Sequence, residues 1–173
     1  VVENKISFIH AIPGKIEAEH YFNQKGIEIE STSDENGGYN IGSLDNGDYA
    51  DYYVKIESGD LYNVTYRSAA DPNWSSGGQI ELSILDPTTG TYSSLQNVIL
   101  PTTGGWQTWE STSKALTLPE GEHQIRLKIL EGPFNLNWFS FDNNVSVGIP
   151  VPGYLEAEDY VYQIKRLVHP KLH

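Results

Sequence analysis

Two glutamates separated by a single residue are the first candidates for chemistry in this sequence, Glu17 and Glu19. On a β-strand, residues i and i+2 lie on the same face, so the two carboxylates would lie side by side. Such a pair repels unless it is solvated or shares a cation, and calcium binds through several oxygen ligands. Asp142, near the end of the last expected strand, would complete a calcium site where the first and last strands meet. The alternative is a solvated acidic face.

Aromatic residues in glycine-rich stretches are the second candidates. Tyr39 follows two consecutive glycines, as does Trp106, and Trp74 lies in the turn-rich stretch 71–78. A large ring on such a loop is poorly placed for a core and well placed as an exposed platform. Sugars have an apolar face of C–H groups that stacks on such a ring. The alternative is that these rings cover the ends of the fold.

Alternating asparagines form a third feature, because Asn135 and Asn137 would share one strand face. An asparagine amide both donates and accepts hydrogen bonds, which matches a sugar hydroxyl. The alternative is that these asparagines form a turn after Gly132-Pro133.

Signals for catalysis are weak. Paired carboxylates serve glycoside hydrolysis, but Glu17 and Glu19 occupy nearby positions on one strand and not opposite sides of a cleft. The five histidines show no metal-ligand spacing, and the sequence has no nucleophile elbow and no phosphate-binding loop.

The composition excludes several classes of partner. With 11 basic and 23 acidic residues, the net charge is −12, which disfavours nucleic acid and anionic membranes as partners. It suits neutral partners or cations. The sequence has no cysteine, so it contains no disulfide and no zinc–thiolate site. No apolar run is long enough to span a bilayer, and no signal peptide is visible.

Strand periodicity dominates the chain. Alternating stretches such as 61–67, 79–84 and 124–129 are separated by glycine-, proline- and asparagine-rich breaks. Many short, half-buried strands at even spacing predict an all-β fold, which we interpret as a β-sandwich jelly roll of two antiparallel sheets.

The start of the domain occurs twice. Residues 12–22 recur at 151–161, including the Glu-Ala-Glu of the proposed cation site, which predicts tandem modules. We therefore expect an N-terminal linker or first strand at 1–14 and one module at 15–145. Residues 146–162 would be a linker with the truncated start of a second like module. Residues 163–173 are basic and aperiodic, and we expect a vector-derived or disordered tail there.

The ordered set of motifs resembles a family-six carbohydrate-binding module. No single motif is specific, but together they cover residues 15–143 in family order. The segments that carry the resemblance are Ile16-Glu17-Ala18-Glu19, Gly37-Gly38-Tyr39-Asn40-Ile41-Gly42, Asp45-Asn46-Gly47-Asp48-Tyr49-Ala50-Asp51-Tyr52, Tyr62-Asn63-Val64-Thr65-Tyr66-Arg67, Gly104-Gly105-Trp106-Gln107-Thr108-Trp109 and Asn135-Leu136-Asn137-Trp138-Phe139. The sequence departs from the family pattern at Tyr49, where tryptophan is common, and in an expanded loop at 71–78.

The resemblance implies two sites. A structural Ca²⁺ would be held by Glu17, Glu19 and Asp142. A sugar would bind in edge loops, and motif position assigns this site to Tyr39 and Trp106 as facing rings, Asn135, and Glu28 or Glu30 as the carboxylate. Some members carry a second sugar site on a concave sheet face, for which the sequence assigns no residues.

We therefore expect a non-catalytic module that binds a neutral plant or algal polysaccharide such as agarose, a laminarin-type β-glucan or xylan. It would be a secreted, extracellular monomer that holds a linked glycoside hydrolase on its polymer, beside a second like module. The alternatives are a glycoside hydrolase or lyase domain, and a calcium-binding adhesion repeat that binds no sugar.

Overall fold

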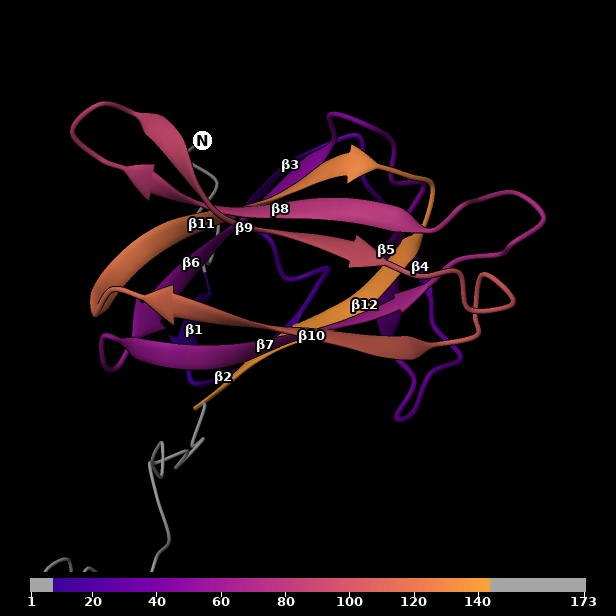
Figure 1. Ribbon diagram of the computed structural model, residues 1–173, viewed down its shortest axis with the longest axis horizontal. Coiled ribbons are helices and arrows are strands. Elements are labelled where there is room, and N and C mark those ends of the chain that lie inside the picture. Colours follow the sequence, from indigo (N-terminus) through magenta and orange to yellow (C-terminus); the bar gives the residue numbers. More distant parts are fainter. Residues whose placement is uncertain (1–7, 144–173) are drawn as a thin grey trace, which may run out of the picture.

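The structure is a computed structural model, and it describes residues 8–143. The predicted repeat at 151–161, the linker at 146–162 and the tail at 163–173 lie outside the described residues. Within them, all regular structure is β-strand, arranged as two six-stranded sheets (Figure 1). None of the described residues forms a helix long and apolar enough to cross a membrane.

The first sheet, sheet A, is built around three long central strands. Its order is β1 (Ile9–Ile12), β6 (Tyr49–Ile56), β11 (Gly121–Glu131), β8 (Gly78–Asp86) and β9 (Thr91–Leu100), with β3 (Asn23–Lys25) also pairing with β6. All neighbours are antiparallel except β1, which runs parallel to β6. The folded unit therefore includes residues that lie before the predicted start of the module.

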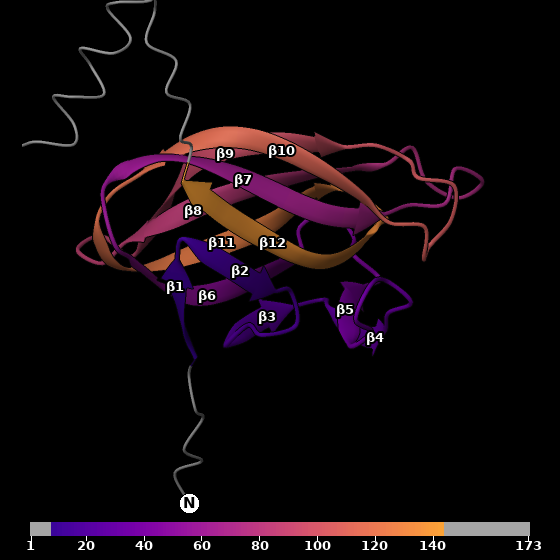
Figure 2. The same cartoon turned by 90° about the horizontal axis from the view of Figure 1, so that it is seen from below.

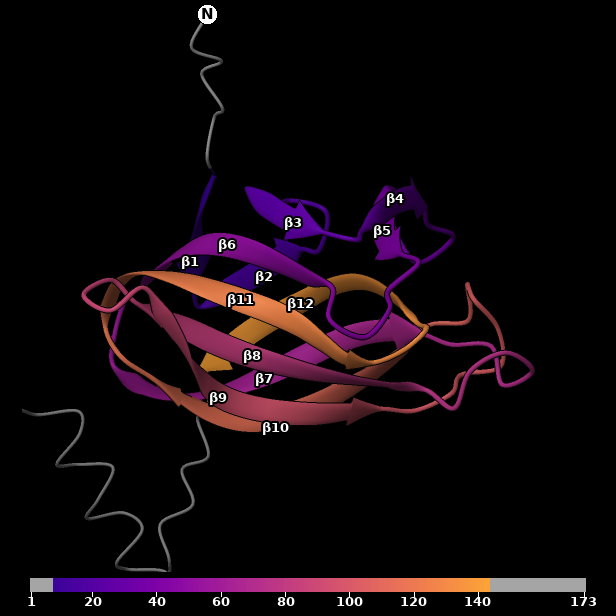
Figure 3. The same cartoon turned by 90° about the horizontal axis from the view of Figure 1, so that it is seen from above.

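The second sheet, sheet B, provides the strands that support the predicted sugar site. Its order is β10 (Glu110–Leu118), β7 (Asp60–Ala69), β12 (Asn135–Asn143), β5 (Tyr39–Gly42) and β4 (Glu28–Ser31), with β2 (Gly14–Glu17) also pairing with β12. Figures 2 and 3 show the sheets as two layers, with β7 and β10 on the side opposite to β6 and β11.

The core lies between the sheets and follows the predicted alternation. On β7, Tyr62, Val64 and Tyr66 are fully buried, while the residues between them face outward. The inward residues of β8 and β11 are likewise buried. Burial of each such side chain contributes roughly 1.5–3 kcal/mol. The predicted β-sandwich is confirmed, and it leaves the loops at one end of the sandwich free to carry a site.

Candidate carbohydrate-binding site

A hollow of about 310 Å³ lies at the end of the sandwich where β4 and β5 meet the loop between β9 and β10. It is lined by Glu30, Ser43, Trp106, Pro133, Phe134 and Asn135. Its volume is at the lower end of the range of ligand pockets, about 300–1,000 Å³. Three of the residues predicted for sugar binding, Glu30, Trp106 and Asn135, are therefore brought together here from positions far apart in the sequence.

The Glu30 carboxylate is fixed by three amide side chains, which all donate to the same oxygen. Oε1 of Glu30 accepts from Nδ2 of Asn135 at 2.6 Å, Nδ2 of Asn40 at 2.9 Å and Nε2 of Gln107 at 3.3 Å. No hydrogen bond from another residue in 8–143 reaches its Oε2. Glu30 thus presents one oriented, unused acceptor to a ligand.

The side-chain amide of Asn135 is also held in one orientation by hydrogen bonds. One amide hydrogen points to Glu30, and the other is used by the carbonyl oxygen of Trp106, at 2.8 Å from Nδ2. Both donors of the side chain are consumed, so the group left for a ligand is the acceptor Oδ1. This oxygen faces β5, where a methyl group added at Gly42 would lie only 2.9 Å from it.

Gln107 joins the two loops that border the hollow. Its Oε1 accepts from the backbone N–H of Ser33 at 2.8 Å, while its Nε2 donates to Glu30 and, at 3.2 Å, to Oδ1 of Asn40. The loop between β9 and β10 is thereby bound to the loop between β4 and β5. Sequence reasoning missed Gln107 and Asn40 as site residues, although each directly follows a predicted aromatic residue.

The other residues predicted for the sugar site lie on its margin. Tyr39 begins β5, is 56% exposed and does not line the hollow. Glu28 is one alternation before Glu30 on β4, but its carboxylate accepts from Oγ of Ser43 at 3.0 Å and does not line the hollow. Of the two glutamates, only Glu30 therefore lines the hollow.

The predicted cation site is brought together only in part. Strand β2 ends at Glu17, whose carboxylate lies 2.5 Å from Nζ of Lys15, and Glu19 follows in a turn. Oε2 of Glu19 is buried and has no hydrogen-bond partner. Burial raises the pKa of Glu19, and the negative charge of Glu17 adds to that rise. An orphaned, buried carboxylate oxygen beside a second carboxylate fits a cation.

Asp142 does not belong to this pair, which corrects the predicted ligand set. In the antiparallel register of β2 with β12, Glu17 lies opposite Trp138, and Asp142 is four residues further along β12. Four strand residues span roughly 13 Å. Within residues 8–143, no group of three or more histidine, aspartate or glutamate side chains could hold a metal ion. Further ligands of the pair would have to be other oxygen atoms.

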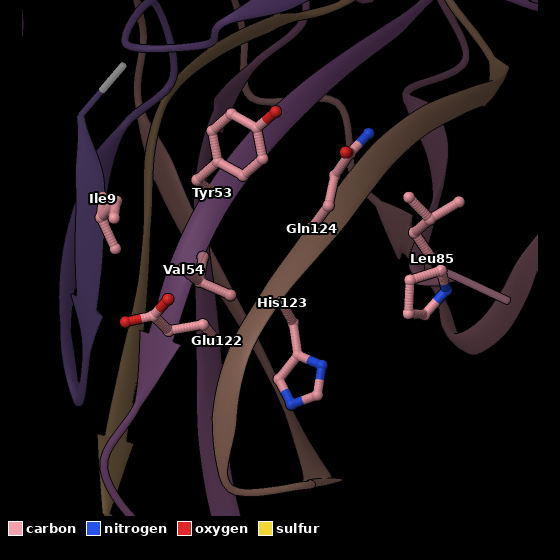
Figure 4. A pocket seen from close by; sticks show the side chains of 8 residues that line it. Ile9, Tyr53, Val54, Leu85, Glu122, His123 and Gln124 are labelled. Atoms are coloured by element: carbon pink, nitrogen blue, oxygen red, sulfur yellow. The ribbon is translucent and has the colours of Figure 1, made fainter. Parts of the chain in front are cut away.

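Two further hollows contain none of the residues predicted for sugar binding. One, of about 300 Å³ on sheet A, is lined mainly by apolar side chains, including Ile9, Tyr53, Leu85 and Pro87 (Figure 4). The other, of about 330 Å³ on the outer face of sheet B, has Trp138 and the Arg67–Asp34 ion pair in its wall.

Tyr49, the residue at which the sequence departs from the family pattern, is covered by another side chain of the protein. On the outer face of sheet A, the guanidinium of Arg126 lies 3.7 Å from the ring centroid of Tyr49 and 4.1 Å from that of Tyr92. Arg126 also makes two hydrogen bonds to Asp51, at 2.7 and 2.9 Å. Both ring faces that point at Arg126 are therefore occupied.

Comparison with known proteins finds a family model and curated relatives that match most of this chain. The model of the family described as "Carbohydrate binding module (family 6)" matches residues 17–143. The clotting factor G alpha subunit of Tachypleus tridentatus is 28% identical over 84% of this chain, and endo-1,4-beta-xylanase A of Thermoclostridium stercorarium is 31% identical over 84%. The chain spans only 21% and 22% of the length of these two relatives.

Solved structures show the same fold. A β-1,3-glucan-binding module from Bacillus halodurans superposes with a TM-score of 0.67 at 32% identity, covering 78% of this chain and 99% of that one. A module from Clostridium cellulolyticum, solved in complex with xylose, superposes with a TM-score of 0.66 at 33% identity, covering 78% of this chain and all of that one.

Proposed function

Since this chain belongs to family 6 of the carbohydrate-binding modules, we propose that it binds a neutral β-linked polysaccharide, either a laminarin-type β-glucan or a xylan. The ligand would occupy the hollow formed by Glu30, Trp106 and Asn135. The observation that carries the proposal is the arrangement of hydrogen-bonding groups in this hollow. Two oriented acceptor oxygens, one on Glu30 and one on Asn135, lie beside the indole ring of Trp106.

Each part of the hollow has a role in the proposed binding. The half-buried Trp106 ring stacks on the C–H face of a sugar, and Tyr39, exposed at the start of β5, closes the other side as the second ring of the clamp. Oε2 of Glu30 and Oδ1 of Asn135 accept hydrogen bonds from sugar hydroxyls. Because both carboxylate and amide are already held by protein contacts, little side-chain freedom is lost on binding.

The choice of polymer is supported by the relatives. A β-1,3-glucan-binding module and a module in complex with xylose are each more than 30% identical to this chain. Agarose is the third candidate from the sequence. One small clamp for a neutral ligand corresponds to a dissociation constant on the order of micromolar to millimolar.

In the parent protein, we propose that the module keeps a linked glycoside hydrolase close to its polymer outside the cell. Attachment raises the effective concentration of the enzyme at the polymer without any catalytic group in the module. We also propose that Glu17 and Glu19 hold a structural Ca²⁺ together with further oxygen ligands. The orphaned Oε2 of Glu19 supports this.

Affinity electrophoresis on laminarin, xylan and agarose, followed by calorimetry with oligosaccharides of the retained polymer, tests the proposal. Trp106→Ala should abolish binding while the fold persists, because the residue lies in a loop. Trp138→Ala is a matched control, since it also removes a half-buried tryptophan, but from the outer face of sheet B.

The outcomes separate the three hollows. Loss of binding in Trp106→Ala together with retention in Trp138→Ala and Tyr53→Ala supports the proposed site. Retention in Trp106→Ala, with loss in one of the other two variants, would assign binding to the hollow that this variant alters. Retardation by none of the three polymers would refute the proposed ligand class.

A further inference from the structure

Trp74 is the most exposed large hydrophobic side chain among residues 8–143, at 76%. It lies in the loop between β7 and β8 and has almost no core packing. Tryptophan is highly buried on average in folded proteins, so this exposed ring is a candidate for contact with a ligand.

The loop that carries Trp74 is held in shape by its own hydrogen bonds. The carboxylate of Asp71 accepts from the backbone N–H and the side-chain amide of Asn73, at 2.9 and 2.8 Å. The backbone carbonyl of Asp71 accepts from the N–H groups of Trp74 and Ser75, at 3.0 and 2.9 Å. A ring on such an ordered turn loses little backbone freedom when it binds a ligand.

The same loop is also bonded to both sides of the sugar-binding hollow. Three hydrogen bonds join Ala70 and Thr103, two of 2.9 Å and one of 3.4 Å, and Thr103 is in the loop that carries Trp106. Oγ of Ser75 donates to the carbonyl oxygen of Pro133 at 2.6 Å, and Pro133 lines the hollow. In Figures 1 and 3 the loops between β7 and β8 and between β9 and β10 project together from one end of the sandwich.

We propose that Trp74 forms an additional subsite, on which a further sugar unit of the bound chain stacks beyond the unit held at Trp106. This inference rests on the proposed function and extends it. The ligand would be an oligosaccharide longer than the hollow itself can hold, with the apolar face of one outer unit on the indole ring. Asp71 and Asn73, which precede Trp74 in the same turn, provide polar groups for its hydroxyls.

The inference makes affinity depend on chain length. In the unmutated module, which is the parent of these variants, affinity should rise as the oligosaccharide is extended until its outer unit reaches Trp74. Beyond that length the affinity should stay constant. Trp74→Ala should bind the shortest ligands like the parent and lose roughly three- to tenfold in affinity for the long ones. Trp74→Phe should recover part of the loss, because it restores an apolar ring.

The experiment is calorimetry on the whole chain with a length series from monosaccharide to hexasaccharide of the polymer that the module retains. Leu61→Ala is the control, because Leu61 is also exposed, at 41%, but lies at the opposite end of β7. Thermal unfolding of each variant confirms that it is folded. Loss of long-chain affinity in Trp74→Ala but not in Leu61→Ala supports the subsite.

Three results would overturn the inference, and they are distinct from failure of the proposed function. These are a parent whose affinity does not change with length, a Trp74→Ala variant that matches the parent at every length, and one that loses affinity equally at every length. If Trp106→Ala still binds the monosaccharide and the hexasaccharide like the parent, the proposed site itself is refuted.

Discussion

Replacing Asp34 by asparagine should loosen the loop that leads from β4 to Tyr39. The Asp34 carboxylate accepts from Nε and Nη2 of Arg67, at 2.9 and 2.7 Å, and from Nδ2 of Asn137 at 2.8 Å. Its side chain is only 5% exposed. These contacts fasten the loop to the outer face of sheet B, next to the point where Gln107 fastens it to the Trp106 loop.

The pKa of Asp34 gives the size of the effect. Hydrogen bonds from Arg67, and in second place from Asn137, lower this pKa from 3.8 to about 2. Taken in full, such a change corresponds to about 2.5 kcal/mol, at 1.36 kcal/mol per pKa unit. Because Arg67 is 23% exposed, solvent screening reduces the contribution, and we expect about 1–2 kcal/mol.

The pH dependence has a definite sign. A carboxyl whose pKa is lowered in the folded state stabilises the fold above its unfolded pKa, and this stabilisation is lost as the pH falls through the folded pKa. For Asp34 the loss should occur between about pH 4 and pH 2. Asp34→Asn should therefore be less stable than the parent at pH 7, and the difference should shrink towards pH 2.

Urea denaturation at pH 7 and near pH 2.5 measures this difference, with Asp142→Asn as a control that removes an exposed carboxylate. Calorimetry with the bound oligosaccharide at pH 7 should also show weaker binding in Asp34→Asn. The reasoning fails if Asp34→Asn is as stable as the parent at pH 7, or if its deficit is the same at both pH values.

Two further predictions concern the hollow and the proposed cation. Gly42→Ala places a methyl group 2.9 Å from Oδ1 of Asn135 and 3.3 Å from Oε1 of Glu30. Calorimetry should therefore show about tenfold weaker sugar binding, and urea denaturation should show a free energy of unfolding lower by about 1–3 kcal/mol. Parent-like affinity would show that Oδ1 of Asn135 makes no ligand contact. Chelation should lower the melting temperature, because a cation bound only to the native state stabilises it, and Glu19→Gln should remove this response. An unchanged melting curve, with no calcium in metal analysis, would contradict the proposed cation site.

Much of the fold follows from the sequence, because side-chain alternation on a strand directly reports which face is buried. The inward set on β7, Tyr62, Val64 and Tyr66, is an example. Pairing register is not encoded so locally. Asp142 was expected beside Glu17 on the assumption that the first and last strands are neighbours. The strand that carries Glu17 is β2, and it does pair with β12, but the register places Trp138 opposite Glu17. The parallel pairing of β1 with β6 is likewise set by the tertiary fold.

The site shows a similar division between what residue type reveals and what packing decides. The types and order of Tyr39, Trp106 and Asn135 suffice to predict a sugar site at a loop end. They do not reveal that Asn40, next to the exposed Tyr39, points the opposite way and is fully buried under the hollow. Nor do they reveal which atoms accept the amide hydrogens of Asn135. These acceptors belong to Trp106 and Glu30, which precede Asn135 by 29 and 105 positions in the sequence.

That use of amide hydrogens has a consequence for selectivity. Three amide side chains direct their N–H groups at one oxygen of Glu30, so the protein consumes its own donors and leaves acceptors for the ligand. A hydroxyl can donate to Oε2 of Glu30 or Oδ1 of Asn135, whereas a uronate carboxylate or a sulfate ester brings only acceptors and a like charge. The net charge of −12 acts in the same direction over a longer range. Local hydrogen bonding and overall charge thus independently favour a neutral polysaccharide over an anionic one.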